Sequence, residues 1–376
     1  MRVIDLFSGC GGISLGFKRA GFDIIMGIDN NTPALETFKE NFPEAEIFNG
    51  DISQLDPFDV MERLNIRQGE LECLVGGPPC QGFSKNVPAR NRFFDDERNL
   101  LVTHFLRFVE AIRPKMVLME NVAELAKAYQ NGYTEIIIGE LQRLGYHAEW
   151  NKLLAADYGV PQMRRRAFFL ASRISDDSLF PDPTHSSDVN NVDLFNYDVS
   201  PYVNVWEAIS DLPSLNHGEG EDVMEYPSEP LTYYQHLMRQ ESYGYLYNHK
   251  ARKLSDIQFQ RISSISEGQG IKDLPDELRP KSGYSGAYGR LWRDKPAPTI
   301  TCWVFHPGSG RFSHPIDERV ITIREAARIQ SFDDGFKFVG SYNEQSRQVG
   351  NAVPPLLVKK IALQFRGILI TQTNHV

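Results

Sequence analysis

The sequence predicts a doubly wound α/β fold, in which a Rossmann-like domain is accompanied by a second, smaller domain. Three observations lead to this prediction. Short apolar runs typical of buried strands alternate with helical segments through residues 3–171. A glycine-rich turn follows the first strand, as in nucleotide-binding α/β units. The length of 376 residues favours two domains over one.

Composition is that of an ordinary soluble globular protein, with 41% apolar and 24% charged residues. No apolar run approaches the roughly 18–20 residues of a membrane span, and Met1–Asp5 enters a strand pattern without a signal peptide. The net charge of −9, averaged over the chain, argues weakly against a nucleic-acid partner. The cysteines are widely spread along the chain and show no spacing typical of metal ligands; they are Cys10, Cys73, Cys80 and Cys302. This pattern suits a protein of the reducing cytoplasm and predicts that no metal is bound.

The first unit consists of a strand over Val3–Phe7, a glycine turn over Ser8–Gly12 and a helix over Ile13–Ala20. A second strand, Ile24–Ile28, ends at Asp29. An acidic residue about 20 positions beyond the glycine turn is expected to bind a ribose hydroxyl.

The turn reads Gly-x-Gly-Gly from Gly9 and lacks the Gly-x-Gly-x-x-Gly spacing that suits a pyrophosphate. This favours a nucleoside cofactor without pyrophosphate, above all S-adenosylmethionine; a plain flavodoxin-like turn is the alternative. A helix over Pro33–Asn41 and a strand over Ala45–Phe48 lead to Asp51. Asp51 either accepts a hydrogen bond from an adenine amine or caps the next helix, and both roles are compatible.

A rigid loop, Gly76–Ser84, follows the apolar strand Leu71–Val75 and presents Cys80. A thiol at such a loop is well placed to act as a nucleophile. For Cys80 taken alone, a small buried cysteine in an ordinary turn is the more common situation. The next segment, Lys85–Arg98, is polar, basic and aromatic, and is expected to form a lid.

The next predicted strand is Lys115–Met119, which follows a helix over Asn99–Ile112 and ends at Glu120. Glu120 therefore lies at the same edge of the sheet as the acidic residues and the cysteine described above, where open α/β sheets bind ligands. Spacing alone leaves open whether it caps a helix or acts as a catalytic acid. A helix over Glu135–Leu144 and a strand over His147–Leu154 follow.

A run of three arginines precedes the last predicted strand of this region, Ala167–Ala171. In an extended segment the side chains alternate, so Arg165 is expected to point away from Arg164 and Arg166.

Together these motifs resemble the DNA (cytosine-5) methyltransferase family of the bacterial restriction-modification type. Six motifs occur in the family's order: the cofactor turn Asp5–Gly12, the nucleophile loop Pro78–Gln81, the acid motif Glu120–Val122, the basic motif Gln162–Arg166, the late helix Arg324–Phe332 and the closing cofactor motif Gln348–Pro354. One departure is Asp29-Asn30-Asn31, where the family usually has Glu-x-Asp. Asp29 still supplies the ribose-binding acid, whereas Asn31 replaces the second carboxylate.

The resemblance implies methyl transfer from S-adenosylmethionine to C5 of a flipped-out cytosine, with S-adenosylhomocysteine as product. Cys80 would add to C6, and Glu120 would be protonated or share a proton with N3. Arg164 or Arg166 would favour the thiolate, and both would hold the cytosine together with Glu120. No residue is identified as the base that removes the C5 proton, and water is an alternative. The implied cofactor-binding residues are Phe7, Gly9, Cys10, Gly12, Asp29, Asp51, Ile52, Pro79, Leu101, Asn351 and Val353.

The charge distribution locates a DNA-reading region. Residues 174–238 contain no Lys or Arg and thirteen acidic residues, so we expect mostly a solvated connector there. Basic residues interleaved with glycines and aromatics return over 240–312, which we expect to face DNA; a scattered solvated basic face is the alternative. The candidate DNA contacts are Lys85, Arg90, Arg92, Lys250, Arg252 and Arg290.

The predicted catalytic domain is discontinuous: residues 1–180 are completed by 323–376, and 181–322 form the target-recognition domain. An apolar helix, Leu356–Ile370, should pack back on the first domain and bring Asn351 to the glycine turn.

The expected partners are double-stranded DNA and a cognate restriction endonuclease, and no membrane association is expected. The enzyme is expected to be a monomer in the bacterial cytoplasm, associated with the nucleoid.

Three alternative functions are weighed against this hypothesis. An RNA-directed relative is disfavoured because its Cys-Phe-Thr signature is absent. A non-catalytic DNA-binding homologue is disfavoured by the presence of both Cys80 and Glu120, and a nicotinamide-dependent oxidoreductase by the glycine spacing.

Overall fold

The computed structural model describes residues 1–79, 100–123, 132–188, 199–281, 283 and 285–373. The chain forms two compact units. Unit 1 comprises Met1–Leu154, Arg165–Asp182 and Pro355–Val376, and unit 2 comprises Ala155–Arg164 and Pro183–Pro354. Residues 323–354 thus pack within unit 2, and the domain boundaries drawn from the sequence stay a prediction.

Unit 1 is built on a seven-stranded sheet in the order β3-β2-β1-β4-β5-β7-β6. Its first five strands run parallel, and β7 is antiparallel to both β5 and β6. The strands are β1 (Arg2–Leu6), β2 (Asp23–Asp29), β3 (Glu46–Asn49), β4 (Cys73–Gly76), β5 (Met116–Val122), β6 (His147–Leu154) and β7 (Arg165–Ser172). The chain leaves β1 towards β2 and later returns to β1's other side as β4, so a topological switch point lies at the carboxyl ends of β1 and β4.

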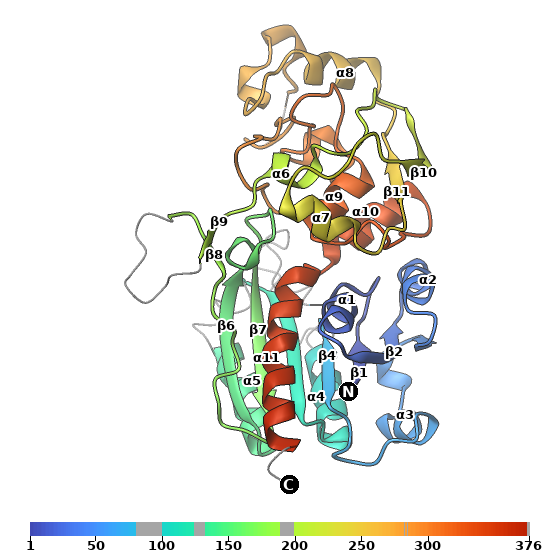
Figure 1. The fold of residues 1–376 in the computed structure, drawn as a ribbon, viewed down its shortest axis with the longest axis vertical. Helices are drawn as coiled ribbons and strands as arrows, with labels where there is room; N and C mark the ends of the chain where they lie inside the picture. Colours follow the sequence, from blue (N-terminus) through green and yellow to red (C-terminus); the bar gives the residue numbers. More distant parts are fainter. Residues whose placement is uncertain (80–99, 124–131, 189–198, 282, 284, 374–376) are drawn as a thin grey trace. The chain divides into compact units, whose positions relative to one another are not determined.

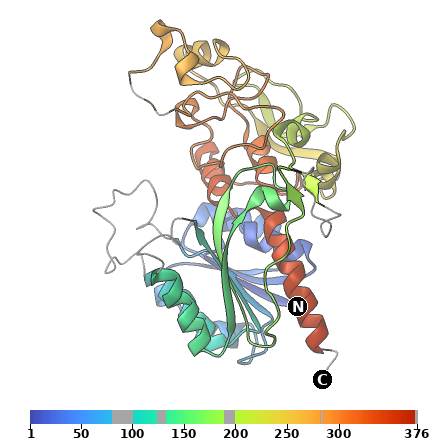
Figure 2. The same ribbon diagram turned by 90° about the vertical axis from the view of Figure 1, so that its left-hand side faces the viewer.

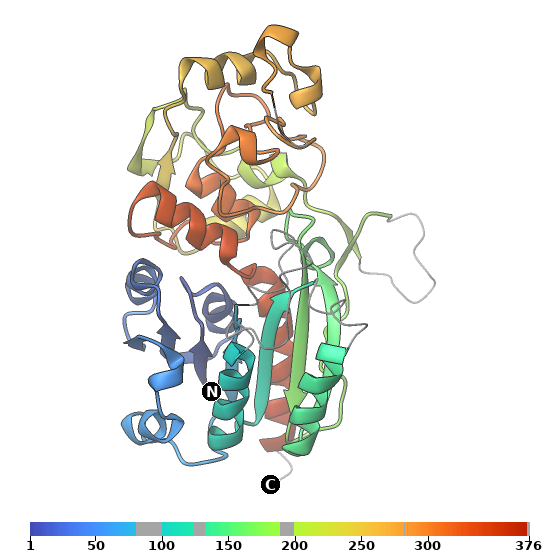
Figure 3. The same cartoon turned by 180° about the vertical axis from the view of Figure 1, so that it is seen from behind.

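Helices cover both faces of this sheet, which explains why its central strands β1, β4 and β5 are buried almost throughout. Figure 1 shows α11 lying beside α1 along one face, and Figures 2 and 3 show α5 on the opposite face. The helices of unit 1 are α1 (Gly12–Arg19), α2 (Thr32–Asn41), α3 (Pro57–Arg63), α4 (Leu100–Ile112), α5 (Gly132–Arg143) and α11 (Pro355–Thr373), with the short 3₁₀ helix η1 (Ile52–Gln54).

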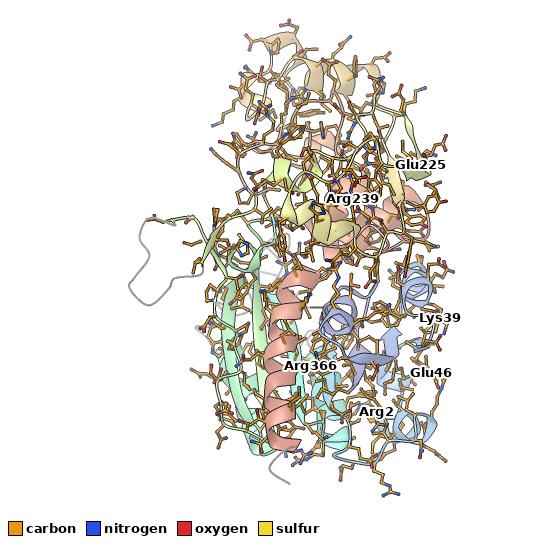
Figure 4. The ribbon with its side chains drawn as sticks, in the orientation of Figure 1. Arg2, Lys39, Glu46, Glu225, Arg239 and Arg366 are labelled. Carbon is orange, nitrogen blue, oxygen red and sulfur yellow. The ribbon has the colours of Figure 1, made fainter. Side chains whose placement is uncertain are left out.

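The C-terminal helix α11 packs closely against α1, as the apolar pattern predicts. Gly16 is required at this contact, because a Cβ atom there would lie 2.5 Å from the Cβ of Val358. Arg366, labelled in Figure 4, donates a hydrogen bond to the carbonyl of Ala20 at 3.3 Å. The first and last segments of unit 1 are therefore tied together, which fixes the helix that begins at the glycine turn.

Unit 2 contains short helices and an antiparallel hairpin, one strand of which packs against a helix. The hairpin pairs β10 (Gly220–Glu225) with β11 (Tyr245–Lys250), and β8 (His185–Ser186) pairs with β9 (Ser200–Pro201). The helices are α6 (Val205–Ile209), α7 (Tyr233–Arg239), α8 (Asp256–Ser263), α9 (Ile323–Ile329) and α10 (Tyr342–Asn351), with 3₁₀ helices η5 (Ala155–Tyr158), η6 (Ile271–Asp273), η7 (Asp276–Leu278) and η8 (Pro307–Ser309).

The expectation of a solvated connector over 174–238 is wrong for its second half. Helices α6 and α7 pack within unit 2, and the side chain of Asp211 is fully buried. Asp211 accepts hydrogen bonds from Arg239 Nε at 2.8 Å and from Arg328 Nη2 at 3.1 Å. The charge of Asp211 is therefore neutralised by arginines that come later in the chain.

No helix in the described part of the chain is long and apolar enough to cross a bilayer.

Candidate active site

The turn between β1 and α1 places backbone and side-chain groups at the switch point of the sheet. Gly9 and Gly11 have φ angles of 54° and 98°, and Phe7 shares this left-handed region with φ 59°. A Cβ atom at Gly9 would meet nothing within 4 Å, so the turn is open on that side. The turn can therefore admit a ligand close to its backbone.

Asp29, at the carboxyl end of β2, supports this turn directly. Its Oδ2 accepts the Gly9 N–H at 2.8 Å, and its Oδ1 accepts the Asn31 N–H at 2.8 Å. Burial raises the pKa of the Asp29 carboxyl, and the two backbone donors oppose that shift. Asn31 has a role as well: its side chain caps α2 by accepting the Ala34 N–H.

Beneath the turn lies a buried polar pair that spacing did not reveal. Ser14 Oγ donates to Asp5 Oδ2 at 2.6 Å. Burial raises the pKa of Asp5 to about 7, against the opposing effect of the Ser14 bond. Among the described residues, Asp5 Oδ1 and Ser8 Oγ are buried without a hydrogen-bond partner. Buried orphan groups of this kind mark positions where a ligand or water completes the bonding.

The third acidic residue, Asp51, is exposed and caps η1 by accepting the Ser53 N–H at 2.8 Å. This backbone bond lowers the pKa of Asp51. The η1 turn is held from α4, where Arg107 Nη2 donates to the carbonyls of Ile52 and Leu55 at 2.7 and 2.8 Å. Sequence analysis missed Arg107, because its partners are backbone atoms far away in the chain.

At the carboxyl end of β5, Glu120 pairs with Arg166 of β7: Arg166 Nε lies 2.9 Å from Glu120 Oε1. Only 11% of the glutamate side chain and 18% of the arginine side chain are exposed. A Cβ atom on Gly77 would lie 3.1 Å from Glu120 Oε2. The absence of a side chain at Gly77 thus leaves room for the carboxylate.

Asn121 ties the same two elements together, because its Nδ2 donates to the carbonyl of Pro78 at 3.0 Å in a buried position. The loop begins next to the acid, with Pro78 buried and Pro79 exposed. Four predicted site residues lie outside the described residues: Cys80, Lys85, Arg90 and Arg92.

The three arginines differ in environment. Arg164 is 1% exposed, and within unit 2 it donates to the carbonyls of Ile300 and Gly350 at 2.9 and 3.0 Å. Arg165 is exposed, as the alternating pattern predicts. Within unit 1, Arg166 is the member of this run that forms an ion pair with Glu120.

The remaining predicted cofactor residues divide between the units. In unit 1, Cys10 and Ile52 are buried, Gly12 begins α1, and Leu101 packs against the core. Burial raises the pKa of the Cys10 thiol to about 12. In unit 2, Asn351 ends α10 with an exposed side chain and Val353 is buried. Whether Asn351 meets the glycine turn stays a prediction.

The predicted DNA contacts in unit 2 also differ from one another. Lys250 and Arg252 are exposed. Arg290 is 4% exposed, and its guanidinium donates to backbone carbonyls at 2.7–3.1 Å. Its acceptors are the carbonyls of Ile262, Ile265, His314, Ile316 and Asp317. All three guanidinium nitrogens of Arg290 are therefore engaged with backbone carbonyls within unit 2.

The strand order and the ligand-binding edge define a Rossmann-like fold of the S-adenosylmethionine-dependent class, as predicted. Residues 1–366 match the C-5 cytosine-specific DNA methylases, and the chain belongs to that family. Members of the family use S-adenosylmethionine as methyl donor. The predictions of family, fold class and enzyme class are confirmed.

Two relatives and one solved structure illustrate the match. The type II methyltransferase M1.HphI of Haemophilus parahaemolyticus is 35% identical over 100% of this chain and 88% of its own length. The type II methyltransferase M.DdeI of Desulfomicrobium norvegicum is 36% identical over 96% and 88%. An E. coli protein described as a DNA modification methyltransferase encoded within a prophage superimposes with a TM-score of 0.77 at 28% identity, covering 98% and 99% of the two chains.

Proposed function

We propose that this chain methylates C5 of a cytosine flipped out of a specific duplex DNA sequence, with Cys80 as the nucleophile. The observation that carries the proposal is the mostly buried Arg166–Glu120 pair, which lies against Gly77 of the loop that leads to Cys80. The carboxyl group of Glu120 thus lies beside Gly77, which precedes Cys80 closely in the sequence.

The residues of the β1–α1 turn fit S-adenosylmethionine, which supplies a methyl group on an electrophilic sulfonium. The open face at Gly9 admits a nucleoside, and the Asp29 carboxylate next to it can accept from ribose hydroxyls. Asp51 and Ile52 would bind the adenine, and Phe7 would stack on it. Asp5 Oδ1 and Ser8 Oγ, which lack partners in the described part of the chain, support a ligand at this turn.

The chemistry assigned to the other residues follows from the weak nucleophilicity of cytosine C5. Addition of the Cys80 thiolate to C6 makes C5 enamine-like and pushes electrons towards N3. Glu120 shares a proton with N3 and so stabilises the adduct. Arg166 orients the carboxyl group and places a positive charge beside the base. After methyl transfer a base removes the C5 proton, C6–S cleaves, and Cys80 leaves as thiolate.

For Arg164 and Arg290 we propose structural roles in place of base and DNA contacts, because backbone carbonyls occupy their guanidinium groups. Lys250 and Arg252 remain the proposed DNA contacts of unit 2, with Lys85, Arg90 and Arg92 in the segment after Cys80. We further propose that the enzyme is a monomer in the bacterial cytoplasm that protects the site cut by a cognate restriction endonuclease. The names of the type II relatives support that setting.

The test uses S-adenosylmethionine tritiated in its methyl group, mixed-sequence duplex DNA and tRNA, with wild type beside Cys80→Ala. Label should enter DNA only and be lost in the variant, after which bisulfite sequencing identifies the target cytosine. Label in tRNA would reassign the substrate. Tight DNA binding without label in either nucleic acid would indicate a non-catalytic homologue.

A further inference from the structure

The thiol of Cys302 is hydrogen-bonded to the side chain of Asn351, a proposed cofactor-binding residue. Cys302 Sγ donates to Asn351 Oδ1 at 2.8 Å. Both residues belong to unit 2 and are far apart in sequence. The cysteine is half-buried and lies outside every motif that carries the family resemblance.

This contact is built into a rigid frame. A Cβ atom at Gly350 would lie 2.3 Å from the backbone nitrogen of Cys302, so the two segments touch without an intervening side chain. Ser346 Oγ donates to the Cys302 carbonyl at 3.0 Å. Arg164 bridges the segments by donating to both the Ile300 and Gly350 carbonyls. The backbones of Cys302 and Asn351 are thereby held in fixed register.

The direction of the hydrogen bond determines which end of the Asn351 amide is presented outward. An asparagine amide has an oxygen acceptor and an amino donor that exchange places on a half turn of the side chain. The thiol is a donor here and selects the oxygen, so the amino group faces away from it. In the part of the chain that the structure describes, that amino group donates to no protein atom and is available to an acceptor.

We infer that Cys302 is a positioning residue: it orients the Asn351 amide so that its amino group donates to an oxygen of S-adenosylmethionine. The inference rests on the proposed function and on the expectation, implied by the family resemblance, that Asn351 binds the cofactor. A neutral hydrogen bond contributes about 0.5–1.5 kcal/mol, which converts to roughly 2- to 13-fold in affinity. Because a thiol is a weak donor, the lower half of that range is expected.

The same placement makes Cys302 a point at which a thiol reagent can affect cofactor binding. Cys10 and Cys73 are 3% and 0% exposed, so among the described cysteines Cys302 is the accessible one. Addition of its S–H across the double bond of a maleimide removes the donor and places bulk beside Asn351. Alkylation is therefore expected to weaken cofactor binding more than removal of the thiol does.

The test measures S-adenosylhomocysteine binding by calorimetry on the full chain, together with thermal unfolding. Cys302→Ala should raise the dissociation constant about 2- to 5-fold and leave the unfolding temperature unchanged. Cys302→Ser, which keeps a donor, should bind within about 2-fold of wild type. In turnover assays the KM for S-adenosylmethionine should rise while kcat stays constant. In a Cys80→Ala background, N-ethylmaleimide should reduce binding, and added S-adenosylhomocysteine should slow the modification.

The outcomes separate this inference from the proposed function. If wild type binds no S-adenosylhomocysteine, the proposed function itself fails. If Asn351→Ala weakens binding and Cys302→Ala does not, the function stands and the positioning role is refuted. Equal loss in Cys302→Ala and Cys302→Ser, with lower unfolding temperatures in both, would identify a packing residue and overturn the inference.

Discussion

Arg166 Nε lies 2.9 Å from Glu120 Oε1, across the antiparallel pairing of β5 with β7. The pairing places Arg166 opposite Val122, so the arginine reaches back along the sheet edge to the carboxylate. Because both side chains are mostly buried, little solvent screens the interaction. A base that docks against Glu120 therefore meets a carboxyl group already fixed in orientation.

Glu120→Gln should reduce kcat while leaving DNA affinity nearly unchanged. The amide can donate to N3 but cannot transfer a proton, and general acid catalysis contributes about 10²–10⁴-fold. Single-turnover methylation and gel-shift titration with the same duplex would measure the two quantities. An equal loss in both would show that Glu120 acts in binding.

Arg166→Met should lower kcat by about 10- to 100-fold, because the carboxyl group of Glu120 loses its orienting partner. Its neighbour Arg165 is exposed and provides a matched control of the same residue type. Arg165→Met should methylate at close to the wild-type rate. A comparable loss in both variants would mean that general positive charge, and not the pairing with Glu120, is what matters.

The buried pair beneath the cofactor turn predicts a pH dependence of stability. The pKa of Asp5 is raised from 3.8 to about 7, so between these values the folded state binds more protons than the unfolded state. Asp5 therefore lowers the free energy of unfolding as pH rises from about 4 to 7, and this cost is fully present above 7. Each tenfold change in proton affinity corresponds to about 1.4 kcal/mol, so the effect reaches a few kcal/mol.

Urea unfolding of wild type and Asp5→Asn from pH 4 to 8 would check this dependence. The variant should gain stability relative to wild type as pH rises, with the gain levelling off above pH 7. Ser14→Ala removes the bond that lowers the Asp5 pKa, so its transition should lie at higher pH than that of wild type. If the free energy of unfolding varied with pH in the same way for wild type and Asp5→Asn, the raised pKa of Asp5 would be contradicted.

The strands and the carboxyl-edge residues could be predicted because local patterns specify them. Apolar runs ended by Asp29 and Glu120 reflect parallel strands buried on both faces, and the glycine turn reflects positive φ angles. The acidic segment was misjudged because Asp211 is neutralised by Arg328, a residue distant in sequence. The buried bonding of Arg290 could not be predicted either, since its partners are backbone carbonyls that no sequence pattern encodes.

Arg107 should be a positioning residue for the adenine end of the cofactor site. Its two bonds hold the turn that begins after Asp51, so Arg107→Met should weaken S-adenosylhomocysteine binding about 10-fold. Arg113 is the matched control, because it also donates to a backbone carbonyl, that of Leu144, and lies against the Tyr146 ring. Calorimetry should show an affinity loss for Arg107→Met, whereas Arg113→Met should lower only the unfolding temperature. An unchanged affinity of Arg107→Met for S-adenosylhomocysteine would show that Arg107 does not position the cofactor site.

Substitutions at Arg290 and Lys250 should affect different properties of unit 2: the first its folding, and the second its binding of DNA. Arg290→Met leaves several buried carbonyls without donors, each a cost of about 1–3 kcal/mol, so it should lower the unfolding temperature markedly. Lys250 is exposed, and Lys250→Ala should leave that temperature unchanged and weaken binding of all duplexes alike. The slope of log affinity against log salt should fall by about 1 for Lys250→Ala, since one phosphate contact is lost. If folded Arg290→Met instead shows the reduced slope and Lys250→Ala does not, then Arg290 is the phosphate contact and its buried bonding changes when DNA binds.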